Sequence, residues 1–144
     1  MTGDLLTGFE RVRGSSFDHT LTGGSANNYL TRRNGNDRLS GGAGRDRLVG
    51  NSGDDILKGG AGRDFRSGTG GADGFIFQTG DFKDRITDFN FGVDSITFCD
   101  LTFSYLSFLS SEGNLLITYE AVDTLTLEGQ AGLIMDASDF TFMG

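Results

Sequence analysis

Residues 41–76 read GGAGRDRLV, GNSGDDILK, GGAGRDFRS and GTGGADGFI, four nine-residue units in one unbroken register. Three more units, GSSFDHTLT, GGSANNYLT and RRNGNDRLS, come directly before them, so the period runs from Gly14 to Ile76. All of them approximate one ideal unit, G-G-x-G-x-D-x-U-x, in which U is a large apolar residue. A fixed period of this length predicts a stacked repeat architecture, because a unit this short cannot bury its apolar residue alone.

The apolar residue of the unit stands at the eighth position. One inward-facing residue between two outward-facing ones predicts a strand of about three residues, which follows a turn of about six. We therefore predict an all-β parallel roll in which two units make one coil turn and alternate units stack on each other. The eighth position is apolar in every unit but the sixth: Leu21, Leu30, Leu39, Leu48, Leu57 and Phe75.

The sixth position carries the candidate metal ligands. Carboxylate oxygens together with turn carbonyls are hard ligands that suit calcium and do not suit a thiolate-seeking metal. Stacking pairs each sixth residue with the one two units further on, and a cation between them would relieve the repulsion of the two carboxylates. The predicted pairs are Asp37–Asp55, Asp55–Asp73 and Asp46–Asp64, while Asn28 and His19 hold the sixth position of the first two complete units.

Asp also favours turns when no metal is bound, so these residues could be turn caps alone. Asp recurs at this one position in five successive units, however, while the neighbouring positions vary. That fixed phase favours calcium binding, at a minimum of three sites.

Glycine dominates the first and fourth positions of the unit. It tolerates positive φ, and it lets carbonyl oxygens converge in a tight turn without a Cβ in the way. We therefore include the fourth-position glycines in the predicted calcium sites: Gly35, Gly44, Gly53, Gly62 and Gly71.

These units resemble the RTX, or hemolysin-type, calcium-binding repeat, as found in the C-terminal modules of secreted metalloproteases and in the R-modules of alginate C5-epimerases. The likeness continues in GADGFIF, which closes the array, and in DRITDFNFGVDSITF, with Asp84, Asp88 and Asp94 at its acidic positions. The last residues, DASDFTFMG, are similar to the C-termini of type I secretion substrates, and LTGFERVRG is similar to the lead-in strand of the family.

The resemblance implies a right-handed parallel β-roll with calcium in the turns on both sides, and it adds Asp88 to the candidate ligands. It also implies export by the type I secretion machinery to the extracellular space. On this basis we expect a lead-in strand over residues 1–13, the roll over residues 14–76, and a C-terminal β-rich cap with a secretion signal over residues 77–144.

Several residues depart from the repeat. Asn28 keeps a ligand oxygen but carries no charge. In the first unit His19 and Phe17 replace the Asp and Gly of the pattern, so we expect this unit to complete no calcium site. Arg32 and its neighbour Arg33 replace the paired glycines of the third unit, which predicts an altered turn there.

Arg66 is the sixth unit's eighth residue, an inward position where an unpaired charge would be costly. A one-residue slip would place Phe65 inside instead, because a slip exchanges the two faces of a strand. We expect that slip.

The charges are unevenly distributed. The chain has a formal net charge of −8, yet residues 32–76 hold seven Arg and one Lys against six Asp. Arg45 and Arg63 share the fifth position on one side of the predicted roll, and Arg47 lies close to them in sequence. They could be solvated or paired with nearby carboxylates. The alternative is a face that binds an acidic polysaccharide such as alginate, since guanidinium groups match carboxylates in pairs.

Composition argues against catalysis. With one His and one Cys the chain cannot assemble a Ser–His–Asp triad, a Cys–His pair or a His-rich zinc site. Cys99, being alone, makes no internal disulfide. We expect a monomeric, non-catalytic module with calcium as its cofactor, no nucleic-acid partner and no membrane span.

Overall fold

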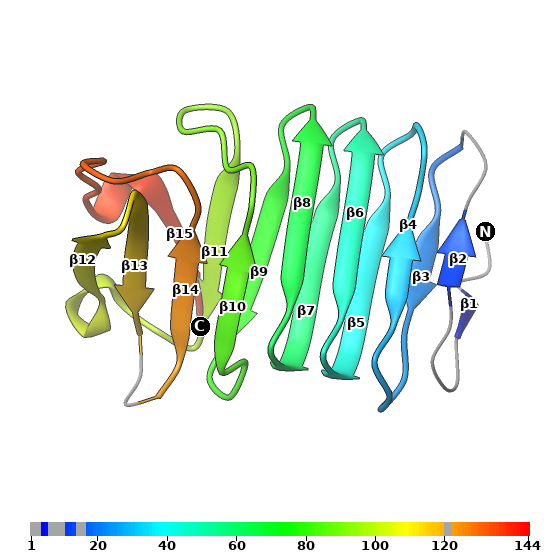
Figure 1. The fold of residues 1–144 in the computed structure, drawn as a ribbon, viewed down its shortest axis with the longest axis horizontal. Helices are drawn as coiled ribbons and strands as arrows, with labels where there is room; N and C mark the ends of the chain where they lie inside the picture. The colour runs from blue at the N-terminus through cyan, green and yellow to red at the C-terminus, as the bar shows by residue number, and fades with distance from the viewer. Residues whose placement is uncertain (1–3, 6–10, 14–16, 120–121) are drawn as a thin grey trace.

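The computed structural model describes residues 4–5, 11–13, 17–119 and 122–144. Strands make up 52% of the molecule and helices 5%, and parallel sheets form a β-solenoid of about four turns. From β1 to β12 successive strands alternate between a seven-stranded and an eight-stranded sheet; β13 and β14 then stay in the eight-stranded sheet, and β15 joins the seven-stranded one (Figure 1). The all-β roll predicted from the repeat is therefore confirmed.

The seven-stranded sheet has the order β1-β3-β5-β7-β9-β11-β15, and the eight-stranded sheet has the order β12-β13-β14-β10-β8-β6-β4-β2. Two short 3₁₀ helices, Phe103–Tyr105 and Ala137–Asp139, lie between strands of the C-terminal part. The strands are β1 (Asp4–Leu5), β2 (Arg11–Arg13), β3 (Thr20–Thr22), β4 (Tyr29–Thr31), β5 (Arg38–Gly44), β6 (Arg47–Ser52), β7 (Ile56–Gly62), β8 (Phe65–Gly70), β9 (Gly74–Gln78), β10 (Lys83–Ile86), β11 (Ser95–Cys99), β12 (Ser107–Ser111), β13 (Asn114–Thr118), β14 (Thr124–Leu127) and β15 (Phe140–Met143).

The core consists of the eighth-position residues, stacked in register. In the seven-stranded sheet Leu21 pairs with Leu39, Leu39 with Leu57, and Leu57 with Phe75. All four side chains are at most 2% exposed. The period of two units per coil turn, predicted from the sequence, therefore sets the packing of the roll.

The expected slip at Arg66 is wrong. Leu48 is paired with Arg66 and Arg47 with Phe65, so β8 keeps the register of the other units. Arg66 is 0% exposed, whereas Phe65 is 41% exposed. The slip does not occur because the buried guanidinium has partners that the repeat alone did not reveal: it forms an ion pair with Asp84.

Parallel pairing continues beyond the repeats. β10 pairs with β8, β11 with β9, and β15 with β11, all parallel. At the end of the eight-stranded sheet the pairing becomes antiparallel, between β12 and β13 and between β13 and β14. In this part the core becomes aromatic, and Phe98 lies 5.0–6.2 Å, between ring centroids, from the four rings of Phe77, Tyr119, Phe140 and Phe142. The division at residue 76 stays a prediction, as does the lead-in segment, of which β1 and β2 are described.

Within the described ranges, no helix is long and apolar enough to cross a bilayer.

Candidate calcium site

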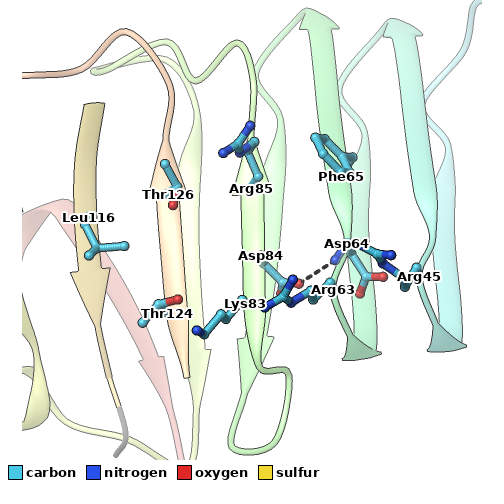
Figure 2. Close-up of a pocket in the computed structure, with 10 residues that line it drawn as sticks. All are labelled: Arg45, Arg63, Asp64, Phe65, Lys83, Asp84, Arg85, Leu116, Thr124 and Thr126. Carbon is cyan, nitrogen blue, oxygen red and sulfur yellow. Dashed lines mark hydrogen bonds between the residues drawn. The ribbon is translucent and has the colours of Figure 1, made fainter. Parts of the chain in front are cut away.

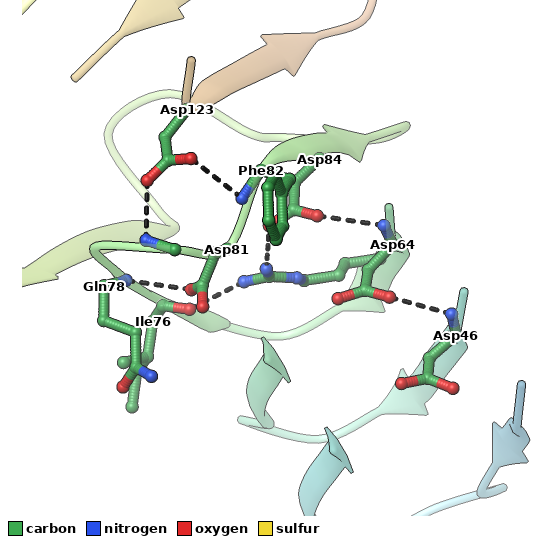
Figure 3. A network of polar contacts seen from close by, with 10 residues as sticks. Asp46, Asp64, Ile76, Gln78, Asp81, Phe82, Asp84 and Asp123 are labelled. Carbon is green, nitrogen blue, oxygen red and sulfur yellow. Dashed lines mark hydrogen bonds and ion pairs between the residues drawn. The ribbon is translucent and has the colours of Figure 1, made fainter. Parts of the chain in front are cut away.

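The sixth residues of the units, together with Asp84 and Asp94 from beyond the repeats, form two columns, each at the start of the strands of one sheet. We call them the Asp46 column (Asn28, Asp46, Asp64 and Asp84) and the Asp55 column (His19, Asp37, Asp55, Asp73 and Asp94). In each column the carboxylate Oδ1 accepts a hydrogen bond from the backbone N–H of the member before it, as Asp55 does from Asp37 at 2.8 Å. Figure 3 shows the equivalent bond from Asp46 to Asp64, also at 2.8 Å. The predicted stacking of Asp37, Asp55 and Asp73, and of Asp46 and Asp64, is therefore confirmed.

The second carboxylate oxygen has no such partner. Among the described residues, the Oδ2 atoms of Asp37, Asp46, Asp55 and Asp64 are buried and accept no hydrogen bond. A buried carboxylate oxygen without a partner is costly, and native proteins leave few of them. Four such atoms at equivalent positions point to a cation beside each of them.

Backbone carbonyls face the same space as these oxygens. The position that a Cβ would take on Gly41, the first residue of its unit, lies 2.6 Å from the Gly59 carbonyl oxygen and closer still to Asp46 Oδ2. The Gly23 position is likewise close to Asn28 Oδ1 and the Gly41 carbonyl oxygen. A side chain at the first position would fill this space, which explains why glycine holds it in units two and four to seven; Arg32 is the exception in the third unit.

The fourth-position glycines line the turns beside these oxygens. Gly35, Gly44, Gly53, Gly62 and Gly71 have φ between 109° and 143°, which other residues rarely adopt. A Cβ on Gly53 would lie under 3.0 Å from the carbonyl oxygen of Gly35, two units earlier. These glycines therefore bring successive turns into direct backbone contact.

The oxygen atoms present suit calcium. No three His, Cys, Asp or Glu side chains converge within the part of the chain that the structure describes, so a metal here needs backbone oxygens as well. Calcium accepts this mixture of carboxylates and carbonyls. The residues that would hold it are the sixth-position Asp and Asn28, with carbonyls of the turn glycines.

The pKa values of the column carboxylates also indicate that a cation is needed there. Burial, as the largest cause, raises the pKa of Asp55 to about 7 and the pKa of Asp46 and Asp73 to about 6. Neighbouring carboxylates raise these pKa values further, whereas the backbone N–H bonds lower them in part. Negative charge on these columns is therefore unfavourable until a cation compensates it.

The remaining predicted ligand, Asp88, is held differently. Its oxygens accept hydrogen bonds from Ser67 Oγ at 2.6 Å and from the backbone N–H groups of Gly68 and Thr69 at 3.3 and 2.9 Å. This arrangement closes the turn of the seventh unit. Its role as a calcium ligand stays a prediction.

The N-terminal members of the columns depart from the repeat as expected. His19 donates its backbone N–H to Asp37 Oδ1 at 2.8 Å, so it continues the hydrogen-bond ladder without contributing a carboxylate. Positive φ occurs at the second position of units four to seven, at Gly42, Asn51, Gly60 and Thr69, but not at Gly24 or Arg33 of units two and three. The altered turn expected for the third unit therefore stays a prediction.

Sequence reasoning missed two sets of residues. Asp84 and Asp94 extend the two columns, accepting the N–H groups of Asp64 and Asp73 at 2.9 and 3.0 Å, but they stand outside the nine-residue period. The fifth position forms a second ladder, in which each side-chain oxygen accepts the backbone N–H two units later, as Asp54 does from Ala72 at 2.8 Å. The recurrence of Asp or Asn at this position was its signal: Asp18, Asn27, Asn36 and Asp54.

Basic side chains gather in a groove of about 460 Å³ beside the Asp46 column. Arg45 and Arg63 line it together with Lys83, and Arg85 stands further along the same face (Figure 2). Among the described residues, Arg45, Arg63 and Lys83 form no ion pair, whereas Arg85 pairs with Glu128 at 2.9 Å.

The third predicted arginine lies elsewhere. Arg47 stacks on Tyr29, 5.7 Å from its ring centroid, and does not line the groove. The structure thus brings Arg45 and Arg63 together and separates Arg47 from them.

A parallel β-roll with buried carboxylates and carbonyls facing one another at its turns defines a calcium-binding repeat module. The sequence agrees: residues 6–39 and 33–65 match the model of the RTX calcium-binding nonapeptide repeat, in four copies. This part of the chain therefore consists of RTX repeats, which are structural elements that bind Ca²⁺.

Solved structures similar to the chain include the extracellular lipase LipA from Serratia marcescens, with 15% identity and a TM-score of 0.48 over 89% of this chain. The chain spans 39% of that lipase. Two subunits of a mannuronan C5-epimerase from Azotobacter vinelandii are also similar, each over 92% of this chain. AlgE6R3 has 29% identity and a TM-score of 0.42, and 82% of its length is covered. AlgE6R2 has 24% identity and a TM-score of 0.44, and 92% of its length is covered. Among curated proteins, no significant match is found.

Proposed function

We propose that this chain is a module that folds when it meets extracellular calcium and thereby supports the export and stability of a larger secreted bacterial protein. The observation that carries the proposal is the set of buried, unpartnered Oδ2 atoms of Asp37, Asp46, Asp55 and Asp64. Without a cation these carboxylates oppose folding, and with one they link successive coil turns.

The mechanism is thermodynamic linkage. Extracellular calcium modules bind at about 10⁻⁴–10⁻³ M, so the sites stay empty at cytosolic calcium concentrations. An empty roll has a thin core and many glycines, and its burial does not offset the entropy of ordering the chain. Outside the cell, calcium binds the folded form alone and stabilises it at each site by RT ln(1 + [L]/Kd).

A calcium titration followed by far-UV circular dichroism tests this function. We expect a disordered spectrum in chelator and a β spectrum that appears cooperatively at calcium concentrations of about 10⁻⁴–10⁻³ M. Magnesium at the same concentration serves as the control, because it demands a smaller octahedral site and should not induce the transition. The same β spectrum with and without calcium would refute the proposal.

Export is a separate part of the proposal and needs its own test. The segment 136–144 is the predicted secretion signal, and in the folded protein it forms β15, with Phe140 8% exposed. In a bacterial host that carries a type I secretion system, deletion of residues 136–144 should keep the chain inside the cell. Undiminished export of the truncated chain would remove this part of the proposal.

A second function is supported by the basic groove: calcium-dependent binding of an acidic polysaccharide such as alginate. Arg45, Arg63 and Lys83 offer unpaired positive charge along one line, and a chain of uronate residues presents carboxylates in a row. Asp64 and Asp84 also line the groove, and the Arg66 guanidinium paired with Asp84 offsets part of their negative charge.

Isothermal calorimetry with oligouronates in calcium buffer tests the second function. Arg45→Ala and Arg63→Ala should each weaken binding about tenfold, which is about 1.4 kcal/mol. Arg38→Ala is the matched control, because Arg38 is an exposed arginine of β5 in the other sheet. Absence of binding heat in the unmodified protein, or equal losses in all three variants, would exclude the groove as the binding site.

The module is non-catalytic in this proposal. Within the described residues, the columns of Asp face backbone carbonyls, and the backbone N–H of His19, the single histidine, bonds Asp37 in one of these columns. The purified chain should therefore turn over neither polysaccharide nor ester substrates. Turnover that copurifies with the chain and responds to its mutation would contradict this.

A further inference from the structure

We call the space between two successive Asp residues of a column a level. The last level of the Asp46 column, between Asp64 and Asp84, already contains a cation of the protein itself, the Arg66 guanidinium. Arg66 Nη2 forms an ion pair with Asp84 Oδ2, and both side chains are 0% exposed. Arg66 Nη1 donates a hydrogen bond to the Ile76 carbonyl oxygen at 2.7 Å. A carboxylate oxygen and a backbone carbonyl oxygen, the two ligand types that calcium would use here, are thus both taken by one guanidinium.

The preceding level shows what Arg66 replaces. At Gly41 the space beside Asp46 Oδ2 is faced by the Gly59 carbonyl oxygen, 2.6 Å from the position of a Cβ. At Gly59, the equivalent residue one coil turn later, the space beside Asp64 Oδ2 is faced by Arg66 Nη2, also 2.6 Å from that position. An oxygen that could bind a cation is therefore exchanged for a nitrogen that carries positive charge.

We propose that Arg66 is a built-in cation that takes the place of calcium between Asp64 and Asp84, so that this level of the column binds no metal ion. The inference rests on the proposed calcium function, because it gives Arg66 the role at this level that calcium has at the earlier levels of the column. It follows from this chain's own departure from the repeat, since Arg66 stands where the other complete units carry Leu or Phe.

Burial and packing keep the guanidinium in this position. Arg66 stands at an inward position of β8, and its guanidinium lies over the ring of Phe77, 4.1 Å from the centroid. A buried arginine is held strongly when its partners are in place, because withdrawing it would leave Asp84 buried without a counter-charge. Calcium cannot enter without displacing this group, and the positive charge repels it.

Crystals of the unmodified protein grown in calcium test the assignment directly. Anomalous difference maps should show calcium beside Asp46 Oδ2 and Asp55 Oδ2 and no calcium between Asp64 and Asp84. A calcium peak between Asp64 and Asp84 would overturn the inference. Absence of calcium at every level would instead show that the calcium function itself is wrong.

A substitution provides the converse test. Arg66→Leu restores the residue type of Leu48, with which Arg66 is in register, and opens the Asp64–Asp84 level to metal. Native mass spectrometry at saturating calcium should then count one more bound calcium ion per chain than in the unmodified protein. Arg66→Lys keeps the charge and should leave the count unchanged, as should Arg38→Leu on the other sheet.

An unchanged count in a folded Arg66→Leu protein would overturn the inference. If Arg66→Leu does not fold, the anomalous maps of the unmodified protein still decide the question. Addition of Asp84→Asn to Arg66→Leu should remove the extra ion again, which locates it at this level.

Discussion

At the sixth position of the repeat, the two oxygens of one carboxylate have different partners. In Asp55, Oδ1 accepts the backbone N–H of Asp37 at 2.8 Å, while Oδ2 is buried and accepts none. The first oxygen sets the register between coil turns, and in the proposed calcium function the second supplies charge to the cation. One residue type at one position thus serves both the fold and the metal.

Asp55→Asn should separate these two roles. The amide keeps an oxygen that can accept the Asp37 N–H, but it removes the negative charge that calcium requires. We expect the calcium concentration at the folding midpoint to rise by about tenfold or more. The neighbouring Asp54→Asn is the matched control, because in the fifth-position ladder Asn27 and Asn36 already accept the same kind of backbone hydrogen bond that Asp54 accepts. Equal shifts in the two variants would contradict the assignment.

The first-position glycines give a second test at the residue scale. A Cβ on Gly68 would lie under 3.0 Å from Asp73 Oδ2, so Gly68→Ala should cost roughly 1–3 kcal/mol of calcium-dependent stability. Gly74→Ala is the control, since the nearest atom to its Cβ position is 3.6 Å away. Urea unfolding at saturating calcium measures both variants. Similar stabilities for the two would show that the space beside Asp73 tolerates a methyl group.

The position of a residue in the fold could be predicted from the sequence when it recurs at one position of the repeat. It could not be predicted when the residue's partner lies outside the repeat. Asp55 recurs with its equivalents every nine residues, so its stacking followed from the period. Arg66 was predicted wrongly because its partner Asp84 comes from β10, after the period has ended. Spacing within the repeat carries no information about that contact.

At the scale of the elements, the two columns concentrate charge at the ends of the sheets and make the roll sensitive to pH. The folded, calcium-free pKa of Asp55 is about 7 and that of Asp46 and Asp73 about 6, against an ordinary value of 3.8. Between these values the folded state binds more protons than the unfolded state, so its stability falls as pH rises from about 4 to about 7.

In calcium-free buffer, lowering the pH from 7 to 5 should therefore increase the β signal in circular dichroism, because protons replace the missing calcium. In calcium buffer the opposite trend is expected, since protons compete with calcium for the same carboxylates. Titrations in buffer depleted of calcium with a chelating resin measure both trends. A calcium-free β signal that is constant or rises with pH would contradict the raised pKa values.

The elements themselves were predictable to different degrees. Strands β3 to β7 and β9 follow from the apolar eighth position, because one buried residue per unit fixes both the strand and its register. The extension of both columns by Asp84 and Asp94 was not predictable, because they lie 20 and 21 residues after their partners rather than 18. Inserted loop residues hide a continuing ladder from a search for a fixed period.

On the scale of the whole molecule, stability comes from two sources that lie in different parts of the roll. In the proposed function the repeat region depends on its leucine columns and on calcium, whereas the C-terminal part has a cluster of aromatic rings centred on Phe98. This cluster joins β9, β11 and β15 of one sheet to Tyr119, directly after β13 of the other.

Phe98→Ala should lower the free energy of unfolding at saturating calcium by about 3–5 kcal/mol, because it opens a cavity among the rings of its neighbours. The number of calcium ions bound by the folded variant should not change, since the cluster contributes no ligand. Phe91→Ala is the control, because the Phe91 side chain is 45% exposed. Loss of a bound calcium ion in a folded Phe98→Ala protein would show that the two parts are not separate in this way.

The central claim is that the buried carboxylate columns require calcium in order to stay folded. Amide hydrogen exchange at residues 37, 46 and 55, whose N–H groups donate to the next Asp Oδ1 in each column, tests it most directly. We predict strong protection of these three amides in calcium and exchange at the rate of an unfolded chain in chelator at pH 7. Equal protection in calcium and in chelator would contradict the claim.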